Sequence, residues 1–193
     1  MARAGALLAA VAMVSACGGG NGGNGGNGGN GGTAQNAQSC GGTVPDAQAM
    51  SNWVPRQGAH WAYFLPDANW VVVESTNSID ISSPTGDALA EIAFAYGPIV
   101  PTTVGAVEDL LWMTLTSHQV LNQSPVVAGG PGQEQTVEYT GVWKTNAHNV
   151  HGIFVAGVGP QVIQGYLIQA NVEVWAADQC TLTLIRNHTR LLG

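Results

Sequence analysis

The sequence predicts an α+β domain, an antiparallel β-sheet with flanking helices, that follows a disordered N-terminal tether. Short segments rich in β-branched and aromatic residues alternate with turns that contain Gly, Pro or Asn, which is typical of antiparallel strands. Apolar residues recur at helical spacing over about 103–118. The segment 18–32 consists of Gly and Asn and has no apolar side chain to bury.

The N-terminus resembles a bacterial lipoprotein signal peptide. Arg3 supplies a positive charge, and the apolar run 6–14 is too short to span a bilayer, which takes about 20 residues. Val14–Cys17 resembles a lipobox. We therefore predict cleavage before Cys17, acylation with chains such as palmitate, and anchoring in the bacterial cell envelope, on the outer membrane or the outer face of the cytoplasmic membrane. The alternatives are an ordinary signal peptide with a chance cysteine and a buried amphipathic helix.

Three segments divide the chain. Residues 1–16 are the predicted signal peptide, residues 17–39 the lipidated cysteine and its linker, and residues 40–193 a single domain. Repeats of Gly-Gly-Asn in the linker cannot offset the entropy of ordering glycine, so we expect a flexible spacer. An Asn- and Gly-rich assembly segment is the alternative.

The first half of the domain is predicted to be mostly strands. A short helix at 46–53, capped by Asp46 and ended by Pro55, precedes them. The alternation in 88–95 breaks phase near Glu91, which predicts a bulge or a register shift. The predicted strands are 61–65, 70–74, 78–82 and 88–95.

The second half contains the strongest helical pattern. It begins at Thr102 or Thr103 and continues to about His118, which would lie at the negative end of the helix dipole. Asp178 is expected to cap the last helix. The predicted elements after the first helix are strands at about 120–127, 135–144, 150–158 and 162–175 and a helix at about 179–191.

The sequence contains three cysteines, of which one is the predicted lipidation site and two are left to pair. If Cys17 carries lipid, Cys40 and Cys180 remain as a pair in an oxidising compartment, and we predict a disulfide between them. Closing so long a loop stabilises by up to about 4 kcal/mol on the chain-entropy model. Two free thiols are the alternative.

Charge excludes some partners. Only 9% of residues are charged, and the net charge is −7. The cations of the mature chain do not form a run, so we expect no nucleic-acid binding and no electrostatic docking on anionic lipids. These cations are Arg56, Lys144, Arg186 and Arg190.

Several segments together form a pattern: they are Trp61–Pro66, Asn69–Trp70, Ile79–Gly86, Trp175–Leu182 and Ile185–Arg190. This pattern resembles PsbP-like domains, which include photosystem accessory subunits and bacterial lipoproteins of the DcrB and LpqN kind. The resemblance implies an α/β/α sandwich around an antiparallel sheet, and a role in binding or in assisting assembly rather than in catalysis. This chain departs from the pattern with Asn-Trp, not Gly-Trp, before its second strand.

No catalytic set or metal site is predicted, and no cofactor. His148 and His151 lie in a turn and a strand, and no nearby Cys or carboxylate completes a zinc site. The acidic pairs Glu108-Asp109 and Asp87/Glu91 are explained by capping or solvation.

The six tryptophans are the most suggestive feature for binding. Trp61, Trp70 and Trp143 are candidate ligand-binding residues, and the alternative is that the tryptophans fill the space between sheet and helices. The leading prediction is a non-enzymatic lipoprotein that binds an envelope protein or assists its assembly. The alternatives are an envelope hydrolase that uses carboxylates or His148 and His151, and a carrier of a small apolar or sugar ligand.

Overall fold

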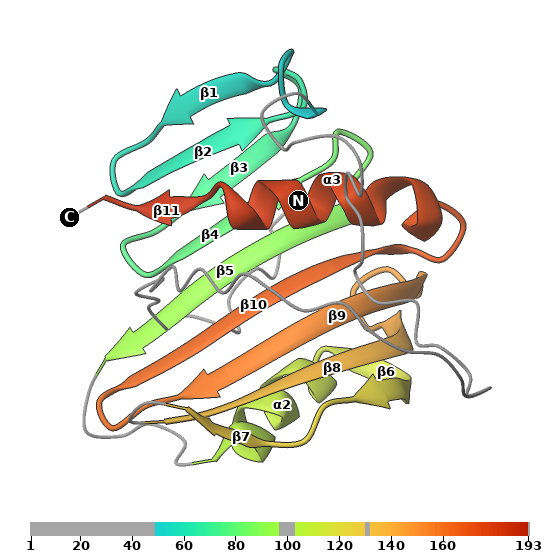
Figure 1. Ribbon diagram of the computed structural model, residues 1–193. Coiled ribbons are helices and arrows are strands. Elements are labelled where there is room, and N and C mark those ends of the chain that lie inside the picture. Colours follow the sequence, from blue (N-terminus) through green and yellow to red (C-terminus); the bar gives the residue numbers. More distant parts are fainter. Residues whose placement is uncertain (1–48, 97–102, 130–131, 193) are drawn as a thin grey trace, which may run out of the picture.

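The computed structural model describes residues 49–96, 103–129 and 132–192 (Figure 1). The predicted signal peptide, the linker, Cys17, Cys40 and the start of the predicted helix 46–53 lie outside these residues. No helix in the described part of the chain is long and apolar enough to cross a membrane.

The described residues form eleven strands and two helices, in this chain order. They are β1 (Val54–Gln57), β2 (Trp61–Leu65), β3 (Val71–Glu74), β4 (Ser78–Ser82), β5 (Ala88–Tyr96), α2 (Val104–Trp112), β6 (Leu115–Gln123), β7 (Val127–Gly129), β8 (Gly132–Trp143), β9 (Asn149–Val158), β10 (Val162–Asn171), α3 (Trp175–Asn187) and β11 (Arg190–Leu191).

The strands form two antiparallel sheets. The main sheet has eight strands in the order β3-β4-β5-β10-β9-β8-β6, and β7 also pairs with β8. The smaller sheet has the order β1-β2-β11. All described pairings are antiparallel, so the predicted α+β class with an antiparallel sheet is confirmed.

The two helices cover opposite faces of the main sheet (Figure 1). Trp112 of α2 contacts Tyr139, whereas Trp175 of α3 stacks on His151. Tyr139 lies opposite Gly152 in the register, so it shares a face with that residue and not with its neighbour His151. We call these faces the α2 side and the α3 side. The small sheet lies on the α3 side, where Trp61 packs against Phe94.

Strand alternation places the core on both faces of the sheet. Ile79 and Ile81 of β4 are buried on the α3 side, and the residues between and around them are half-buried on the α2 side. The largest fully buried side chains are Trp61, Tyr139, Phe154, Ile79, Ile81, Leu111, Ile168, Leu182, Ile185, Gln169 and Val107.

The helix predicted to reach His118 ends at Trp112 instead. The helix begins next to Thr103, one of the two predicted starts, and the Thr103 side chain caps it by accepting a hydrogen bond of 3.3 Å from the Ala106 N–H. At its end the Thr114 hydroxyl donates to the Leu111 carbonyl at 2.7 Å. The chain then becomes β6, because pairing with β8 prevails over the local helical pattern. His118 therefore stacks on Trp112 and caps no helix.

Other boundaries also differ from prediction. The last helix begins at Trp175, so Asp178 lies in its first turn and does not cap it. The preceding strand ends at Asn171. Pro55 ends no helix but lies within β1, where an edge strand tolerates the missing N–H.

The bulge predicted near Glu91 is absent from the described pairing of β5. Its register with β4 and with β10 is continuous. Register shifts occur in β6, between Leu115 and Ser117 and between Val120 and Asn122. The break in the apolar–polar alternation near Glu91 therefore does not mark an irregularity in the pairing of β5.

Alanine substitutions at two glycines, Gly152 and Gly105, test the packing on the α2 side. A Cβ on Gly152 would lie 2.8 Å from Tyr139 Cζ and Oη, so we expect Gly152→Ala to lower the free energy of unfolding by about 1–3 kcal/mol. A Cβ on Gly105 in α2 would meet nothing within 4 Å, so Gly105→Ala should raise it by about 0.5–1 kcal/mol. Urea denaturation measures both, and equal effects would contradict the packing described here.

Candidate functional site

The three candidate tryptophans lie on different elements. Trp61 starts β2, is 1% exposed, and donates its indole N–H to the Ser75 carbonyl at 2.9 Å. Trp70 directly precedes β3, at one edge of the main sheet. Trp143 ends β8, next to the other edge, so the structure does not bring it together with Trp70. All three pack on the core, the arrangement expected if the tryptophans fill the space beside the sheet.

The two histidines considered for metal binding have different partners. His151 Nε2 lies 2.9 Å from Glu138 Oε1, and its ring stacks on Trp175. His148 Nδ1 lies 3.2 Å from the Asn171 side-chain nitrogen. Within the described residues, no group of three His, Cys, Asp or Glu side chains is placed to hold a metal ion.

Cys180 lies in α3 and is half-buried. It forms no disulfide with a described residue. Cys40, its predicted partner, and Cys17, the predicted lipidation site, lie outside the described residues, so both assignments stay predictions.

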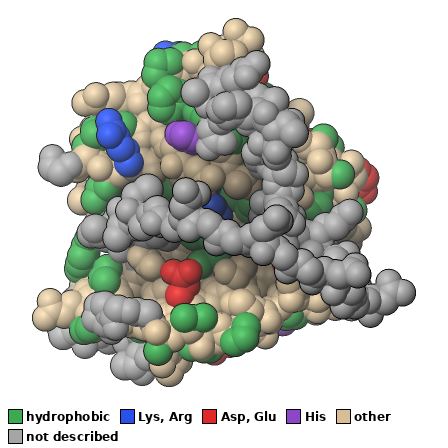
Figure 2. Space-filling model, in the orientation of Figure 1, with side chains coloured by type: hydrophobic (Ala, Val, Ile, Leu, Met, Phe, Trp, Pro, Cys, Tyr) green, Lys and Arg blue, Asp and Glu red, His purple; other side chains and the backbone are tan. Residues whose placement is uncertain are grey.

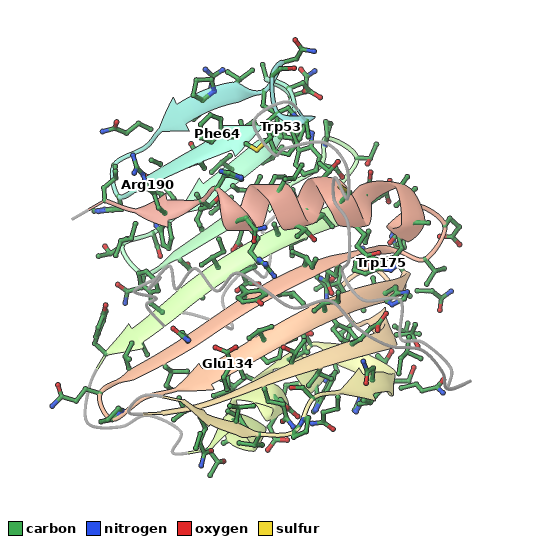
Figure 3. The ribbon with its side chains drawn as sticks, in the orientation of Figure 1. Trp53, Phe64, Glu134, Trp175 and Arg190 are labelled. Atoms are coloured by element: carbon green, nitrogen blue, oxygen red, sulfur yellow. The ribbon has the colours of Figure 1, made fainter. Side chains whose placement is uncertain are left out.

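The α3 side of the sheet carries few charges. Figure 2 shows this side, with isolated acidic and basic side chains among polar and apolar ones. Arg186 lies over the Tyr166 ring at 4.2 Å, and Glu134, labelled in Figure 3, is an exposed residue of β8. The groups on this side have local partners or are solvated.

On the α2 side, two carboxyl side chains face each other, an arrangement that does not stabilise the sheet. Asp80 of β4 lies directly opposite Glu91 of β5 in the register, so the two carboxyls project from the same face of the sheet. Both side chains are half-buried. Like charges directly opposite each other destabilise a sheet, and these two are also partly removed from water. We refer to Asp80 and Glu91 as the carboxyl pair.

Burial governs the ionisation of the carboxyl pair. It raises the pKa of Asp80 from 3.8 to about 6. It raises the pKa of Glu91 from 4.5 to about 8, and the charge of Asp80 adds to that rise. At neutral pH, the pair therefore holds a proton on Glu91. Carboxyls with pKa values this far above normal are typical of functional sites.

Next to the carboxyl pair, a buried side-chain amide lacks one hydrogen-bond partner. Gln169 of β10 is 1% exposed, and its oxygen accepts a 2.8 Å hydrogen bond from the Tyr139 hydroxyl. Its nitrogen has no hydrogen-bond partner among the residues that the structure describes. Burial raises the pKa of the Tyr139 hydroxyl and the Glu91 carboxyl adds to that rise, so the two groups lie within electrostatic reach of each other. Gln169 is on β10, between the strands that carry them.

No described cation neutralises the carboxyl pair. Among the described residues, the one short contact between a basic and an acidic side chain joins His151 Nε2 to Glu138 Oε1 at 2.9 Å, on the opposite face. Lys144 donates to the Met113 carbonyl at 2.6 Å, and Arg186 contacts Tyr166 and Asn187. The carboxyl pair is therefore chemically suited to a cation that comes from another molecule.

The sequence alone does not reveal this site, because capping or solvation accounts for Glu91 as readily as for Asp87. The side chain of Asp87 instead accepts a 2.6 Å hydrogen bond from Asn171. The partner of Glu91 is set by the pairing of β4 with β5, which spacing along the chain does not reveal. The break in phase at Glu91 was the one available signal.

Because both carboxyls have raised pKa values, we expect the free energy of unfolding to fall as the pH rises. Both groups bind protons more tightly in the folded chain, so their contribution is fully present below pH about 4 and is lost as the pH rises through about 6 and about 8. Urea denaturation from pH 4 to pH 9 should show the free energy of unfolding falling. Glu91→Gln should flatten the decline above pH 6, whereas Glu134→Gln, at an exposed position, should leave it unchanged. A decline that persists in Glu91→Gln would contradict the assignment.

This chain is similar to known proteins in structure but not in sequence. No protein-family model matches the sequence, and no curated protein matches it. Solved structures similar to this chain include the cyanobacterial PsbP protein (CyanoP) of Synechocystis, with 11% identity, a TM-score of 0.46, and coverage of 80% of this chain and 98% of that one. A Pseudomonas aeruginosa protein of unknown function has 10% identity, a TM-score of 0.41, and coverage of 68% and 91%. A PsbP protein is thus among the structural neighbours, and the likeness concerns fold alone.

Proposed function

We propose that this chain is a lipid-anchored, extracytoplasmic binding module whose carboxyl pair receives a cationic group of a partner protein. In this proposal, lipid on Cys17 holds the chain in the cell envelope and residues 17–39 act as the spacer. A disulfide between Cys40 and Cys180 ties the start of the domain to α3. The domain itself is a PsbP-like α/β/α sandwich, in keeping with the resemblance of its sequence motifs.

The observation that carries the proposal is the juxtaposition of Asp80 and Glu91 without a described counter-charge. A cation between the two carboxyls would replace their mutual repulsion with two attractions, and would let both ionise. Part of each side chain still meets solvent, so a group from outside can reach them. An ammonium or guanidinium group has the required charge and hydrogen-bond donors.

The surroundings favour a lysine or arginine side chain over a bare metal ion. Val73 lies directly opposite Asp80 and is 54% exposed, and Val71, on the same face, is 38% exposed. Long cationic side chains pack their aliphatic stems on apolar surface while the charged end makes polar contacts. Val71 and Val73 would hold the stem, and the carboxyl pair would hold the charged end.

A peptide titration of the full chain tests this proposal. A blocked pentapeptide with a central lysine should bind, and the same peptide with norleucine should not. Because binding must displace the proton of Glu91, affinity should rise between pH 6 and pH 9. Chemical-shift changes in NMR spectra report binding even when it is weak.

Matched variants separate the site from general acidity. Glu91→Gln and Asp80→Asn should each weaken binding at least about tenfold, the effect of losing roughly 1.4 kcal/mol. Glu134→Gln removes the same charge on the opposite face and should leave the affinity unchanged. Equal weakening by all three variants, or no binding to the unaltered chain, would refute the carboxyl pair as the site. Hydrolysis of an envelope substrate that is lost on replacing His148 and His151 with alanine would favour the hydrolase alternative.

Mass spectrometry of the membrane fraction tests the anchor. We expect a mature N-terminus at Cys17 carrying two or three acyl chains, and loss of the chain from membranes in Cys17→Ala. A Cys180→Ala variant should stay in the membrane fraction. An unmodified thiol at Cys17 or an uncleaved leader would contradict the proposed location.

A further inference from the structure

We propose that Gln169 is a positioning residue of the carboxyl pair, and that its side-chain amide donates a hydrogen bond to the Glu91 carboxylate once an incoming cation has displaced the proton. This inference rests on the proposed function, because it concerns what the carboxyl pair does when it binds. Gln169 is 1% exposed and does not touch the cation. It acts through Glu91, whose ionised form it supports.

Gln169 and Glu91 are diagonal neighbours on the α2 side of the main sheet. Gln169 of β10 lies directly opposite Leu89 of β5, and Glu91 is two residues further along β5, on the same face. Diagonal neighbours of an antiparallel pair have Cα atoms about 7–8 Å apart, a separation that long side chains bridge. Glutamine and glutamate are both long, so a rotation of their side chains brings the amide to the carboxylate.

Tyr139 determines which end of the Gln169 amide is free. The Tyr139 hydroxyl donates to Gln169 Oε1 at 2.8 Å, so the amide oxygen is engaged. The amide nitrogen has no hydrogen-bond partner among the described residues, although the side chain is fully buried. A buried donor without an acceptor costs free energy, and that cost is removed when an acceptor comes within reach. The ionised Glu91 carboxyl is such an acceptor.

No cation faces Glu91 from the described elements around it, so its carboxylate depends on hydrogen-bond donors. Asp80 of β4 lies opposite and is itself an acid, and the hydroxyl of Tyr139 on β8 is given to Gln169. The described strand β10 presents no titratable side chain on this face. Helix α2 lies over β6, β8 and β9, and its buried Glu108 accepts from a glutamine of β6. A buried amide donor therefore matters to the ionised form, because a hydrogen bond to an ion is stronger where water is excluded.

Side-chain NMR of the full, unaltered chain in detergent, without a partner, tests the hydrogen bond and needs no substitution. The Gln169 side-chain amide protons should shift downfield as the pH rises, with the same midpoint as the Glu91 carboxyl carbon. Gln135 is the internal control, because it is also buried and its amide donates to the Ser124 carbonyl at 2.7 Å. Its amide protons should not shift. A Gln169 amide that does not respond to the ionisation of Glu91 would overturn the proposal.

Three variants test the effect of the amide on Glu91. Gln169→Met removes the amide and keeps a long side chain, so the pKa of Glu91 should rise, with its proton held about threefold to tenfold more tightly. The lysine peptide should bind this variant about threefold to tenfold more weakly at pH 9. Gln169→Asn keeps an amide but shortens its reach, and should also raise the pKa of Glu91. Gln135→Met is the matched control at a buried glutamine of β8 and should change neither quantity.

The outcomes separate this inference from the function on which it rests. If the lysine peptide binds Gln169→Met as tightly as the unaltered chain, and the pKa of Glu91 is unchanged, Gln169 has no such role and the proposed function stands. If no lysine peptide binds, the proposed function fails, and the pKa of Glu91 in Gln169→Met still decides whether the amide supports the carboxylate. A fall in that pKa would overturn the proposal, because the amide would then favour the protonated acid.

Discussion

The pairing of β4 with β5 places two carboxyls directly opposite each other, and the functional account depends on that contact. Burial raises the pKa of Asp80 to about 6 and the pKa of Glu91 to about 8, and the charge of Asp80 adds to the rise at Glu91. Two apolar residues at these positions would stabilise the sheet better. A sequence that keeps acids here retains a strained arrangement whose energy can be recovered when a cation binds.

The rest of the fold positions this contact. The central strands bury apolar side chains on both faces, and this holds β5 and β10 in continuous register. Gly152 leaves space for the Tyr139 ring, whose hydroxyl orients the amide of Gln169 beside the carboxyl pair. Among the described elements, α2 covers the α2 side over β6, β8 and β9, so it leaves β4 and β5 to other contacts.

Sequence patterns predict best those strands and helix starts whose conformation is set by residues close together in the chain. The strands at 61–65 and 78–82 match their predicted bounds because alternation and turn residues agree there. Thr103 caps α2 because a short hydroxyl side chain suits that position. The predicted helix extends beyond α2 because Leu115 fits both a helical face and a buried strand position, and pairing with β8 decides between them.

The site could not be predicted in the same way. Asp80 and Glu91 are separated by a turn, and each alone looks like a solvated acid on a half-buried strand. Only the register shows that they are opposite, and only burial shows that their charges are costly. The tryptophans are candidate binding residues by sequence because they are large and rare, yet Trp61 is enclosed by the core.

Site-specific NMR titration of the two side-chain carboxyl carbons tests the central claim most directly. In the chain without a partner, Glu91 should titrate near 8 and Asp80 near 6, and Asp80→Asn should lower the pKa of Glu91. Saturating lysine peptide should lower both values. Titration of both carboxyls near 4, with no response of one to replacement of the other, would show that they are ordinary solvated acids and would contradict the account.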